Sequence, residues 1–561
     1  MKLIERRYTE RDRQALVAAG VDPLLARLYA ARRIASAAEL RYEPASLHAP
    51  GLLKNLEHGA ALLADAIAAK KRLLIVADYD ADGATACAVG MRALRAFGAD
   101  VQYLVPDRFK LGYGLTPELV DLAARQKPDM LITVDNGIAS VEGVARANAL
   151  GIVTLITDHH LPGAELPAAA CIVNPNQPGC EFPSKALAGC GVMFYLMVAV
   201  RAELRRRKHE KAEFHLGSLT DLVALGTVAD VVPLDANNRN LVSQGLKRIR
   251  NGRGQAGINA LLRAAGRRPD EVSSFDFGFV AGPRLNAAGR LADMTLGIEC
   301  LITDDEARAA NCADALDKLN RDRRKIEAGM LEQAVRYLDG VAESGSTFFN
   351  PDWHEGVVGI LASRLKDRLH LPVICFARSV NSAPSGGLLL KGSGRSIPAL
   401  HLRDCLDLVA KRAPGLILRF GGHAQAAGLT IAEADYARFA QAFERALEEQ
   451  LPAAARQRMV ETDGSLETGQ LTLNVARMLE AEIWGQGFPQ PLFCDNFAVE
   501  NQRVVGERHL KLQLQKDGKR YEAMRFGSLD PLPARLRAAY RLAVNEFNGM
   551  KSVQLNVEHY E

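Results

Sequence analysis

The stretch VADYDADGAT, residues 76–85, decides the fold, because it joins a strand-like run to a helical pattern through three aspartates. Asp78, Asp80 and Asp82 stand at alternate positions directly after the apolar run RLLIVA. A short run that is apolar throughout is typical of a strand buried on both faces of a parallel sheet. Like charges crowded at the end of such a strand repel each other unless a cation lies between them, so the stretch predicts a cation-binding loop.

The same pattern continues around this stretch, from about residue 70 to residue 230. Short apolar runs alternate with helical patterns, which predicts a doubly wound α/β domain with a parallel sheet. Ligands of such sheets bind beyond the carboxyl ends of the strands, so polar residues that end these runs would converge there. Four strand-like runs end in this way, on Asp78–Asp82, on Asp135 in TVDNG, on Asp158, His159 and His160 in DHH, and on Asp230 in GTVAD.

Carboxylate and imidazole ligands favour Mg²⁺ or Mn²⁺ over metals that are bound by thiolates. Several acids meeting at one edge of a sheet predict a site with two such ions. Two hard cations would activate a water and stabilise a leaving oxygen without a nucleophilic Ser or Cys, which favours a hydrolase. The sequence contains no G-x-x-x-x-G-K-[ST] stretch, which argues against an ATP-driven enzyme.

Two alternatives concern the same aspartates. DYDADG also matches the first six positions of an EF-hand loop, but the twelfth position is Val89 instead of Glu, and a strand-like run precedes the loop. Each aspartate could instead only cap the helix that follows it. This second alternative stays open for any single aspartate, although it explains the four sites together less well than a metal centre does.

Composition and length set the outer bounds. A chain of 561 residues is too long for a single core and predicts several domains. Its 70 Lys and Arg against 66 Asp and Glu, a net charge of +4, permit a polyanionic partner without requiring one. The nine cysteines include no C-x-x-C pair and favour reduced thiols in the cytoplasm. No run of about 18 apolar residues occurs, which predicts a protein outside the membrane.

The pattern changes after residue 300. Residues 314–338 are amphipathic and lack Pro, which predicts a long helix between two lobes. The next region contains LKGSGRSIP and FGGHAQAAG. These stretches could hold a phosphate through glycine backbone and through donors at the start of a helix, or they could form two ordinary turns. From about residue 460, short strands with the turn KDGK predict a small barrel, either an OB-fold for single strands or a barrel with a structural role alone.

Taken in order, DYDADG, VDNG, DHH and GTVAD resemble motifs one to four of the DHH phosphoesterase superfamily. Further motifs resemble its bacterial single-strand-specific 5′→3′ exonucleases, and these are RFKLGYGL, GPRLNAAGRL, WHEGVVGILASRL, GSGRS and GGHAQAAG. The resemblance implies five segments, which are a helical N-terminal extension (1–45), a DHH catalytic domain (46–300), a connecting helix (301–345), a smaller α/β DHH-associated substrate-binding domain (346–455) and a C-terminal OB-fold barrel (456–561).

The resemblance also implies the ligands of the two metal ions. The first ion would be held by Asp82, Asp135, His159 and Asp230. The second ion would be held by Asp80, by the shared Asp135 and by a histidine four residues before Asp80. This sequence has Val76 at that position, so we assign Asp78 to the second ion, either as a direct ligand or through a water.

The remaining implied residues would act on the substrate. His160 would lie beside the metals, where it either donates to a phosphate oxygen or orients a ligand. Together with Asp135 and His159 it forms the implied catalytic set. The residues implied in DNA or phosphate binding are Arg108, Tyr113, Arg284, Arg290, Ser393, Arg395, Ser396, Gly422 and His423.

These residues together imply a cytoplasmic, monomeric exonuclease that hydrolyses single-stranded DNA from the 5′ end to mononucleotides. It would use two Mn²⁺ or Mg²⁺ ions in a cleft beside the DHH-associated domain and would serve DNA repair and recombination. A single-strand-binding protein and a helicase are candidate partners. Two other functions stay open, namely a phosphodiesterase for short oligonucleotides or cyclic dinucleotides, and a single-strand-binding protein whose metal site has decayed.

Overall fold

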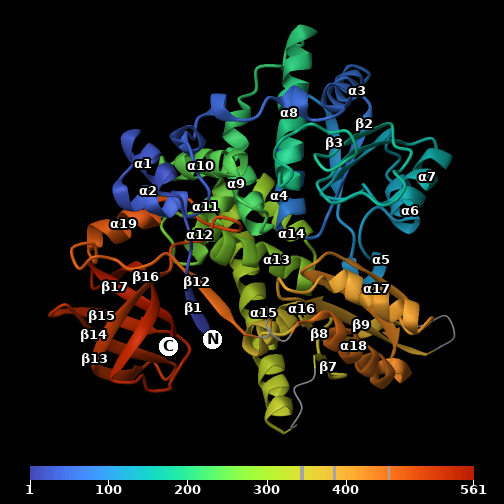
Figure 1. Ribbon diagram of the computed structural model, residues 1–561. Coiled ribbons are helices and arrows are strands. Elements are labelled where there is room, and N and C mark those ends of the chain that lie inside the picture. Colours follow the sequence, from blue (N-terminus) through green and yellow to red (C-terminus); the bar gives the residue numbers. More distant parts are fainter. Residues whose placement is uncertain (341–345, 383–386, 453–454, 456) are drawn as a thin grey trace. The chain divides into compact units, whose positions relative to one another are not determined.

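The computed structural model of the chain describes residues 1–340, 346–382, 387–452, 455 and 457–561 (Figure 1). These residues form two compact units. Unit 1 comprises Met1–Asn286, Asp293–Leu316 and Met459–Glu561, and unit 2 comprises Ala287–Ala292 and Asp317–Arg458. The predicted end of the connecting helix at residue 345 lies outside the described residues.

A parallel five-stranded sheet in unit 1 confirms the predicted doubly wound domain. The strands follow the order β3–β2–β4–β5–β6. Their bounds are β2 (Arg72–Ala77), β3 (Asp100–Leu104), β4 (Met130–Val134), β5 (Val153–Thr157) and β6 (Cys171–Val173). Because β3 lies on one side of β2 and the later strands lie on the other, the switch point of the sheet is at the carboxyl ends of β2 and β4.

Helices cover both faces of this sheet, which is why its strands are apolar throughout. Leu74 and Val76 belong to the core under α6 and α7. Ile75 points to the other face, where a Cβ at Gly90 of α4 would lie 3.0 Å from its Cδ1 and 2.8 Å from Met193 of α8. The helices around the sheet are α3 (Leu56–Ala68), α4 (Ala81–Ala96), α5 (Arg108–Leu111), α6 (Pro117–Ala124), α7 (Val141–Ala149) and α8 (Gly189–Arg206).

One predicted strand is wrong. The run that ends in GTVAD forms helix α9 (Thr220–Ala229), with Asp230 as its C-terminal cap. Residues Thr220 to Thr227 are all buried, so the helix has no polar face to reveal its period in the sequence. The helices that follow are α10 (Ala236–Arg250), α11 (Ala256–Ala264), α12 (Ser274–Asp276), the π-helical turn η6 (Phe277–Ala281), α13 (Gly282–Leu291), α14 (Thr295–Ile302) and the long α15 (Glu306–Gly340).

Unit 2 contains a five-stranded sheet in the order β10–β11–β9–β8–β7, in which only the β7–β8 pair is parallel. Its core includes the rings of Phe376, Phe439 and Phe443. The strands are β7 (Thr347–Phe349), β8 (Val373–Ser382), β9 (Leu388–Arg395), β10 (Arg419–Gly422) and β11 (Ala426–Ala432), and the helices are α16 (Val358–Leu369), α17 (Leu402–Arg412) and α18 (Tyr436–Gln450).

The GSGRS segment does not begin a helix, contrary to prediction. Ser393 and Arg395 lie on strand β9, and the next helix begins only at Leu402. The two glycines allow neighbouring side chains to pack closely against this strand. A Cβ at Gly392 would lie 2.5 Å from the ring of Phe376, and one at Gly394 would lie 2.7 Å from Leu402.

The C-terminal strands of unit 1 form a closed barrel in the order β13–β14–β15–β17–β16, as predicted. Asp517 and Gly518 join β14 to β15 with φ angles of 50° and 75°, which suits the tight hairpin expected from KDGK. The strands are β13 (Phe493–Val505), β14 (His509–Lys516), β15 (Lys519–Arg525), β16 (Arg535–Phe547) and β17 (Met550–Tyr560).

The N-terminal residues join the segment that precedes the barrel. Strand β1 (Lys2–Glu5) pairs in parallel with β12 (Met459–Thr462), and helices α1 (Glu10–Ala18), α2 (Pro23–Ala30) and α19 (Leu473–Ala481) complete this part of unit 1. Arg32 donates two hydrogen bonds to the carboxylate of Asp463, at 2.9 and 3.0 Å. Both side chains are only 1% exposed, so this pair links the N-terminal helices to the segment before the barrel in the interior.

Within the described ranges, the chain forms no helix that is both long and apolar enough to cross a membrane.

Candidate metal centre

The three aspartates after β2 have different local roles. Asp80 is the N-cap of α4, because its Oδ1 accepts from the backbone N–H groups of Asp82 and Gly83, at 2.9 and 3.0 Å. Asp82 turns instead to the start of α8, where its carboxylate accepts from the amides of Gly189 and Cys190, at 2.6 and 3.0 Å. Asp80 therefore caps the helix that follows it, whereas Asp82 binds the first two amides of α8, a helix that begins at Gly189.

Asp135 follows β4 in a strained conformation. Its φ of 62° lies in the left-handed region, which residues other than Gly rarely adopt and which Asn and Asp tolerate best among them. Its amide donates to Thr157 O at 3.0 Å, and the next side chain, Asn136, donates to Val76 O and Val134 O. Bonds on both sides thus hold this backbone at the switch point, and such stored strain is typical of functional sites.

Asp158 organises the two histidines that follow it, a role that the sequence did not reveal. Its Oδ1 accepts from the amide of His159 at 2.7 Å and from the amide of His160 at 3.1 Å, and it lies 2.7 Å from His160 Nδ1. Its Oδ2 accepts from Ile138 N at 2.9 Å. Burial acts to lower the pKa of His160, but the contact with Asp158 outweighs it and raises the pKa to about 9.

Replacing Asp158 with Asn is expected to lower kcat by roughly 10- to 100-fold, the usual cost of losing a partner that orients a metal ligand. KM should change little, because Asp158 is buried behind the histidines. Steady-state kinetics on a single-stranded oligonucleotide measure both constants. Asp129→Asn is the matched control, since that carboxylate binds Arg72 N at the amino end of β2 and should leave kcat unchanged. Equal effects of the two variants would contradict the role of Asp158.

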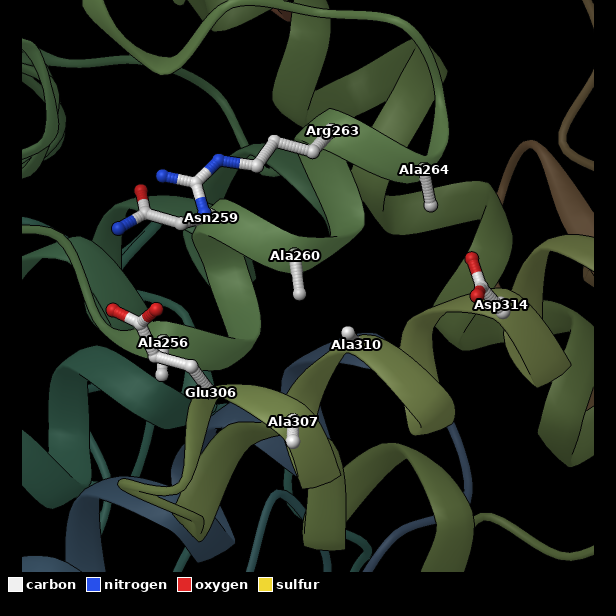
Figure 2. Close-up of a pocket in the computed structure, with 9 residues that line it drawn as sticks. All are labelled: Ala256, Asn259, Ala260, Arg263, Ala264, Glu306, Ala307, Ala310 and Asp314. Atoms are coloured by element: carbon white, nitrogen blue, oxygen red, sulfur yellow. The ribbon is translucent and has the colours of Figure 1, made fainter.

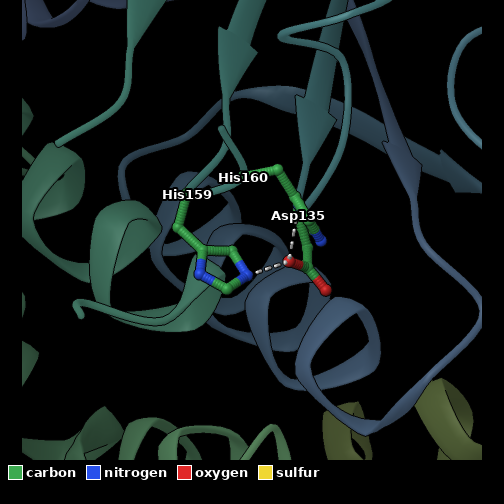
Figure 3. Close-up of side chains that lie close together, drawn as sticks. All are labelled: Asp135, His159 and His160. Atoms are coloured by element: carbon green, nitrogen blue, oxygen red, sulfur yellow. Dashed lines mark ion pairs between the residues drawn. The ribbon is translucent and has the colours of Figure 1, made fainter. Parts of the chain in front are cut away.

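Seven side chains from four separate parts of the chain meet at the carboxyl edge of the sheet. They fall into three overlapping groups, and within each group the ligand atoms lie within 4.8 Å of one another. The groups are Asp82, His159 and Asp230; Asp78, Asp80 and Asp135; and Asp135, His159 and His160. Figure 3 shows the shared carboxylate of Asp135 facing both imidazoles. His159 Nε2 lies 3.1 Å from Asp135 Oδ1 and 3.4 Å from Asp230 Oδ2.

Four buried polar atoms at this edge have no hydrogen-bond partner among the described residues. Among the described residues, none donates to or accepts from Asp78 Oδ1, Asp135 Oδ1, His159 Nε2 or Asp230 Oδ2. Buried polar atoms are almost always paired, so each of these four needs an explanation. A set of oxygen atoms and one imidazole nitrogen that converge in this way fits divalent cations such as Mg²⁺ or Mn²⁺.

The electrostatics of the site agree with this fit. Burial, followed by repulsion from neighbouring carboxylates, raises the pKa values of Asp78, Asp135 and Asp230 well above the usual range. Burial raises the pKa of Asp82 and lowers the pKa of His159. Each shift disfavours the charged form of its side chain, so the ionised carboxylates are costly until a cation compensates them.

Val76 occupies the position of the superfamily histidine but lies in the core under the sheet. Asp78 lies closer to the proposed ligands, since it forms one of the three metal-binding groups with Asp80 and Asp135. The direct or water-mediated assignment of Asp78 to a second ion stays a prediction.

The predicted substrate residues of unit 1 lie in two places. Tyr113 Oη is 3.1 Å from His160 Nδ1, and Arg108 lies over the ring of Tyr79 at 4.6 Å. The rings of Tyr79 and Tyr113 meet edge to face at 6.3 Å. This aromatic contact beside the metal groups includes Tyr79, which the sequence did not single out. Arg284 lies elsewhere, buried in α13, where its Nη1 donates to Val280 O at 2.8 Å.

Most of the predicted substrate residues of unit 2 lie on or next to β9 and β10, and Arg290 lies on α13. Arg395 donates from Nη1 to Ser393 Oγ at 3.1 Å and to Gly394 O at 2.8 Å. Arg290 donates from Nη1 to Gly356 O at 3.2 Å. Ser396 is buried, and its hydroxyl donates to Leu400 O at 2.8 Å. The last two are Gly422, at a φ of 141°, and His423, whose amide donates to Ala426 O. DNA contacts by all of these residues stay predictions.

A separate cavity of about 600 Å³ lies between α11 and α15 (Figure 2). Alanines of both helices line it, with Arg263, Asn259, Glu306 and Asp314 at its edges. None of its lining residues belongs to the three metal-binding groups. This cavity therefore supplies no ligand to the metal centre.

Comparisons with known proteins agree with this geometry. Residues 72–227 match the DHH family, N-terminal domain, residues 336–449 match the DHHA1 domain, and residues 462–559 match the RecJ OB domain. A single-stranded-DNA-specific exonuclease RecJ from Dickeya dadantii (strain 3937) is 48% identical over 555 residues, which cover 96% of this chain and 95% of the relative.

Solved structures show the same likeness. RecJ from Thermus thermophilus in complex with Mn²⁺ matches with a TM-score of 0.81 at 29% identity, covering 100% of this chain and 79% of that chain. The same protein in complex with Mg²⁺ matches with a TM-score of 0.75 at 28% identity, covering 100% and 78%. The superfamily resemblance of the four motifs is thereby confirmed. Since a relative that is 48% identical spans nearly the whole chain, the protein belongs to the RecJ family.

Proposed function

We propose that this protein is a metal-dependent exonuclease that degrades single-stranded DNA from the 5′ end to mononucleotides. The observation that carries the proposal is the convergence of buried ligand atoms without hydrogen-bond partners, among the described residues, at the switch point of the sheet. The relative named as a single-stranded-DNA-specific exonuclease and the Mn²⁺ and Mg²⁺ complexes of the Thermus protein support it. The nearly complete ligand set disfavours a binding protein with a decayed metal site.

The proposed ligands divide between two Mn²⁺ or Mg²⁺ ions. One ion would be held by Asp82, Asp135, His159 and Asp230, and the other by Asp80 and Asp135, with Asp78 bound to it directly or through a water. When bound, two such cations activate a water and stabilise the charge that develops on the phosphate and on the leaving oxygen. The chain contributes the rigid arrangement, because Asp80 and Asp82 are each fixed by two amides and Asp135 by its strained backbone.

His160 and Tyr113 orient the scissile phosphate in this proposal. Asp158 engages His160 Nδ1 at 2.7 Å, so Nε2 is the ring nitrogen left for another partner, and the hydroxyl of Tyr113 lies 3.1 Å from Nδ1 and 3.2 Å from Nε2. The imidazole and the phenol are therefore placed to donate hydrogen bonds to phosphate oxygens. Arg108, stacked on Tyr79, adds a positive charge beside them.

The polarity of the reaction is directly testable. A long single strand with a free 5′ end should be degraded in Mn²⁺ or Mg²⁺ and should resist degradation in excess EDTA. A duplex and a strand with a bulky 5′ adduct should be poor substrates, because a narrow cleft that binds the free 5′ end of one strand cannot admit either. Release of labelled mononucleotides, measured over time, gives each rate.

Two outcomes would reject the proposal. Rapid digestion of a strand that is blocked at both ends would exclude recognition of the 5′ end. Preference for a dinucleotide over a long strand, measured by kcat/KM, would favour the alternative phosphodiesterase for short oligonucleotides or cyclic dinucleotides.

The proposal extends to the predicted domain limits and surroundings. It assigns DNA binding to the predicted substrate residues of both units and to the barrel, within the five segments predicted from the sequence. It places the monomeric enzyme in the cytoplasm, in DNA repair and recombination, with a single-strand-binding protein and a helicase as partners.

A further inference from the structure

The two DHH histidines lie on a stretch of backbone that belongs to no helix or strand. Strand β5 ends at Thr157, and His159 and His160 follow it in irregular structure. The direction of each imidazole therefore depends on how the neighbouring peptide planes are held, because a planar peptide unit leaves only φ and ψ free. Three consecutive planes matter, from the one before His159 to the one after His160.

Side chains bind all three of these planes. Asp158 accepts from the N–H groups of the first two planes. On the carbonyl side, Asn176 donates from Nδ2 to His159 O at 2.6 Å. Asn174 donates from Nδ2 to His160 O at 3.0 Å, and its Oδ1 accepts from the amide of Asn176 at 2.6 Å. The central plane is thus held at both its N–H and its carbonyl.

The loop that carries the two asparagines is closed by its own side chains. It begins directly after β6, and Asn174 is fully buried. Asn176 Nδ2 also donates to Lys185 O at 3.1 Å. Lys185 Nζ in turn donates to Pro175 O and to Cys180 O, both at 2.7 Å. These bonds reduce the freedom of the loop, so the asparagines are presented at fixed positions.

The same loop continues to two other proposed metal ligands. It ends at the start of α8, where the amides of Gly189 and Cys190 bind the carboxylate of Asp82. A Cβ at Gly189 would lie 2.8 Å from Asp135 Oδ1, so a larger residue would displace that carboxylate. The loop therefore fixes its contacts with the histidines relative to two of the carboxylates.

The loop also binds the helix that follows the fourth proposed ligand of the first ion, Asp230. Ser184 donates from Oγ to Asp235 Oδ2 at 2.6 Å. Asp235 is the N-cap of α10, the next helix after Asp230. One loop thus connects the segments that carry all four proposed ligands of this ion.

We propose that Asn174 and Asn176 are positioning residues of the metal centre, which set the directions of His159 and His160 through their backbone carbonyls. We call this pair of asparagines the histidine clamp. The inference rests on the proposed function and assigns metal affinity to two side chains that bind only the backbone. Asparagine suits this task, because its amide donates to a carbonyl without adding charge to a site crowded with carboxylates.

Binding of Mn²⁺ alone to the metal-free protein tests the clamp. In isothermal titration calorimetry, Asn176→Ala should raise the Kd for Mn²⁺ by roughly 10- to 100-fold, the usual effect of losing a partner that orients a metal ligand. Asn174→Ala, which frees His160 O, should act in the same direction. Asn176→Asp keeps the size of the side chain and adds a negative charge that would favour a cation. A higher Kd for this variant therefore reports the lost donor.

Activity gives a second measurement. At limiting Mn²⁺, kcat of Asn176→Ala should fall in proportion to its lower Mn²⁺ occupancy, while KM for a single strand stays near the wild-type value. Raising the Mn²⁺ concentration should restore most of kcat, because the ligands are present and only their arrangement is loosened. A variant that has lost its fold would not recover in this way, and circular dichroism checks the fold directly.

Two controls separate the clamp from general effects. Asn148 on α7 donates from Nδ2 to Ala168 O at 2.9 Å, which is the same kind of bond away from the histidines. Asn148→Ala should keep the wild-type Kd and kcat. Gln177 lies in the loop of the clamp but donates to Ile172 O at 2.9 Å. Gln177→Ala should lower the melting temperature and keep the affinity for Mn²⁺.

Each outcome then has one meaning. If the wild type binds Mn²⁺ but releases no nucleotides from DNA, the proposed function fails, while a raised Kd in the Asn176 variants still supports the clamp. If the wild type is active and both Asn176 variants keep its Kd and its kcat at limiting Mn²⁺, the clamp is overturned. An equal loss of affinity in Gln177→Ala would also overturn it, because the effect would then come from loosening of the whole loop.

Discussion

Replacing Asp135 with Asn is expected to lower kcat by more than about 100-fold, the upper end of the loss seen when only a partner of a metal ligand is removed. Asp135 is the carboxylate that the three metal-binding groups share most, since it belongs to two of them and faces His159 and His160 (Figure 3). Asn is preferred over Ala because it tolerates the φ of 62° at this position. The substitution therefore removes the charge and keeps the backbone.

The same variant should not be less stable than the wild type without metal. Asp135 is buried and is repelled by Asp82, Asp80 and Asp230, which raises its pKa. Removing this charge relieves repulsion, so the melting temperature in EDTA should stay the same or rise. Wild-type protein should gain thermal stability on addition of Mn²⁺, and the variant should lose most of this gain.

Asp121→Asn controls for the loss of a charge. Asp121 is an exposed carboxylate that pairs with Arg146 at 2.7 Å, so its replacement should change neither kcat nor the response to Mn²⁺. A near wild-type kcat for Asp135→Asn, or a strongly lowered melting temperature in EDTA, would refute the assignment of Asp135 as the shared ligand.

Replacing Asp463 with Ala is expected to destabilise unit 1 by about 3–5 kcal/mol, the typical cost of leaving a buried charge without its partner. Asp463 accepts two hydrogen bonds from Arg32, one from Arg6 at 3.0 Å and one from Leu492 N at 3.0 Å. After its removal, the guanidinium of Arg32 would remain 1% exposed with no carboxylate to balance it. The midpoint of the first unfolding transition should therefore move to a lower temperature or a lower urea concentration.

Glu461→Ala is the matched control for this second prediction. Glu461 also pairs with Arg6, at 3.2 Å, but its side chain is 58% exposed. Exposed ion pairs contribute at most about 1 kcal/mol, so the control should shift the transition little. Limited proteolysis adds a local measurement, because Asp463→Ala should release β1 from β12 and expose the N-terminal residues to cleavage. Equal shifts of the two variants would contradict the role assigned to the buried pair.

Local signals in the sequence were enough for much of the fold and of the candidate site. The apolar run before Asp78 predicts a buried strand, and Asp517–Gly518 predicts a hairpin, because both depend on residues close together in the chain. The convergence of Asp135 and His159 could also be predicted, since parallel strands end at one edge of the sheet. Such signals fail where a helix is buried on all sides, because no polar residues then mark its 3.6-residue period. Helix α9 is an example, and its apolar run resembles a strand.

What the sequence determined by itself was the set of chemical groups and the loops that carry them. The tertiary structure decided how each group is held, because the partners come from distant parts of the chain. Asp82 meets the amides of α8, Asp158 accepts from the amide of Ile138, and Lys2 pairs with Met459. No local pattern encodes these contacts. Their geometry follows from the packing of whole elements.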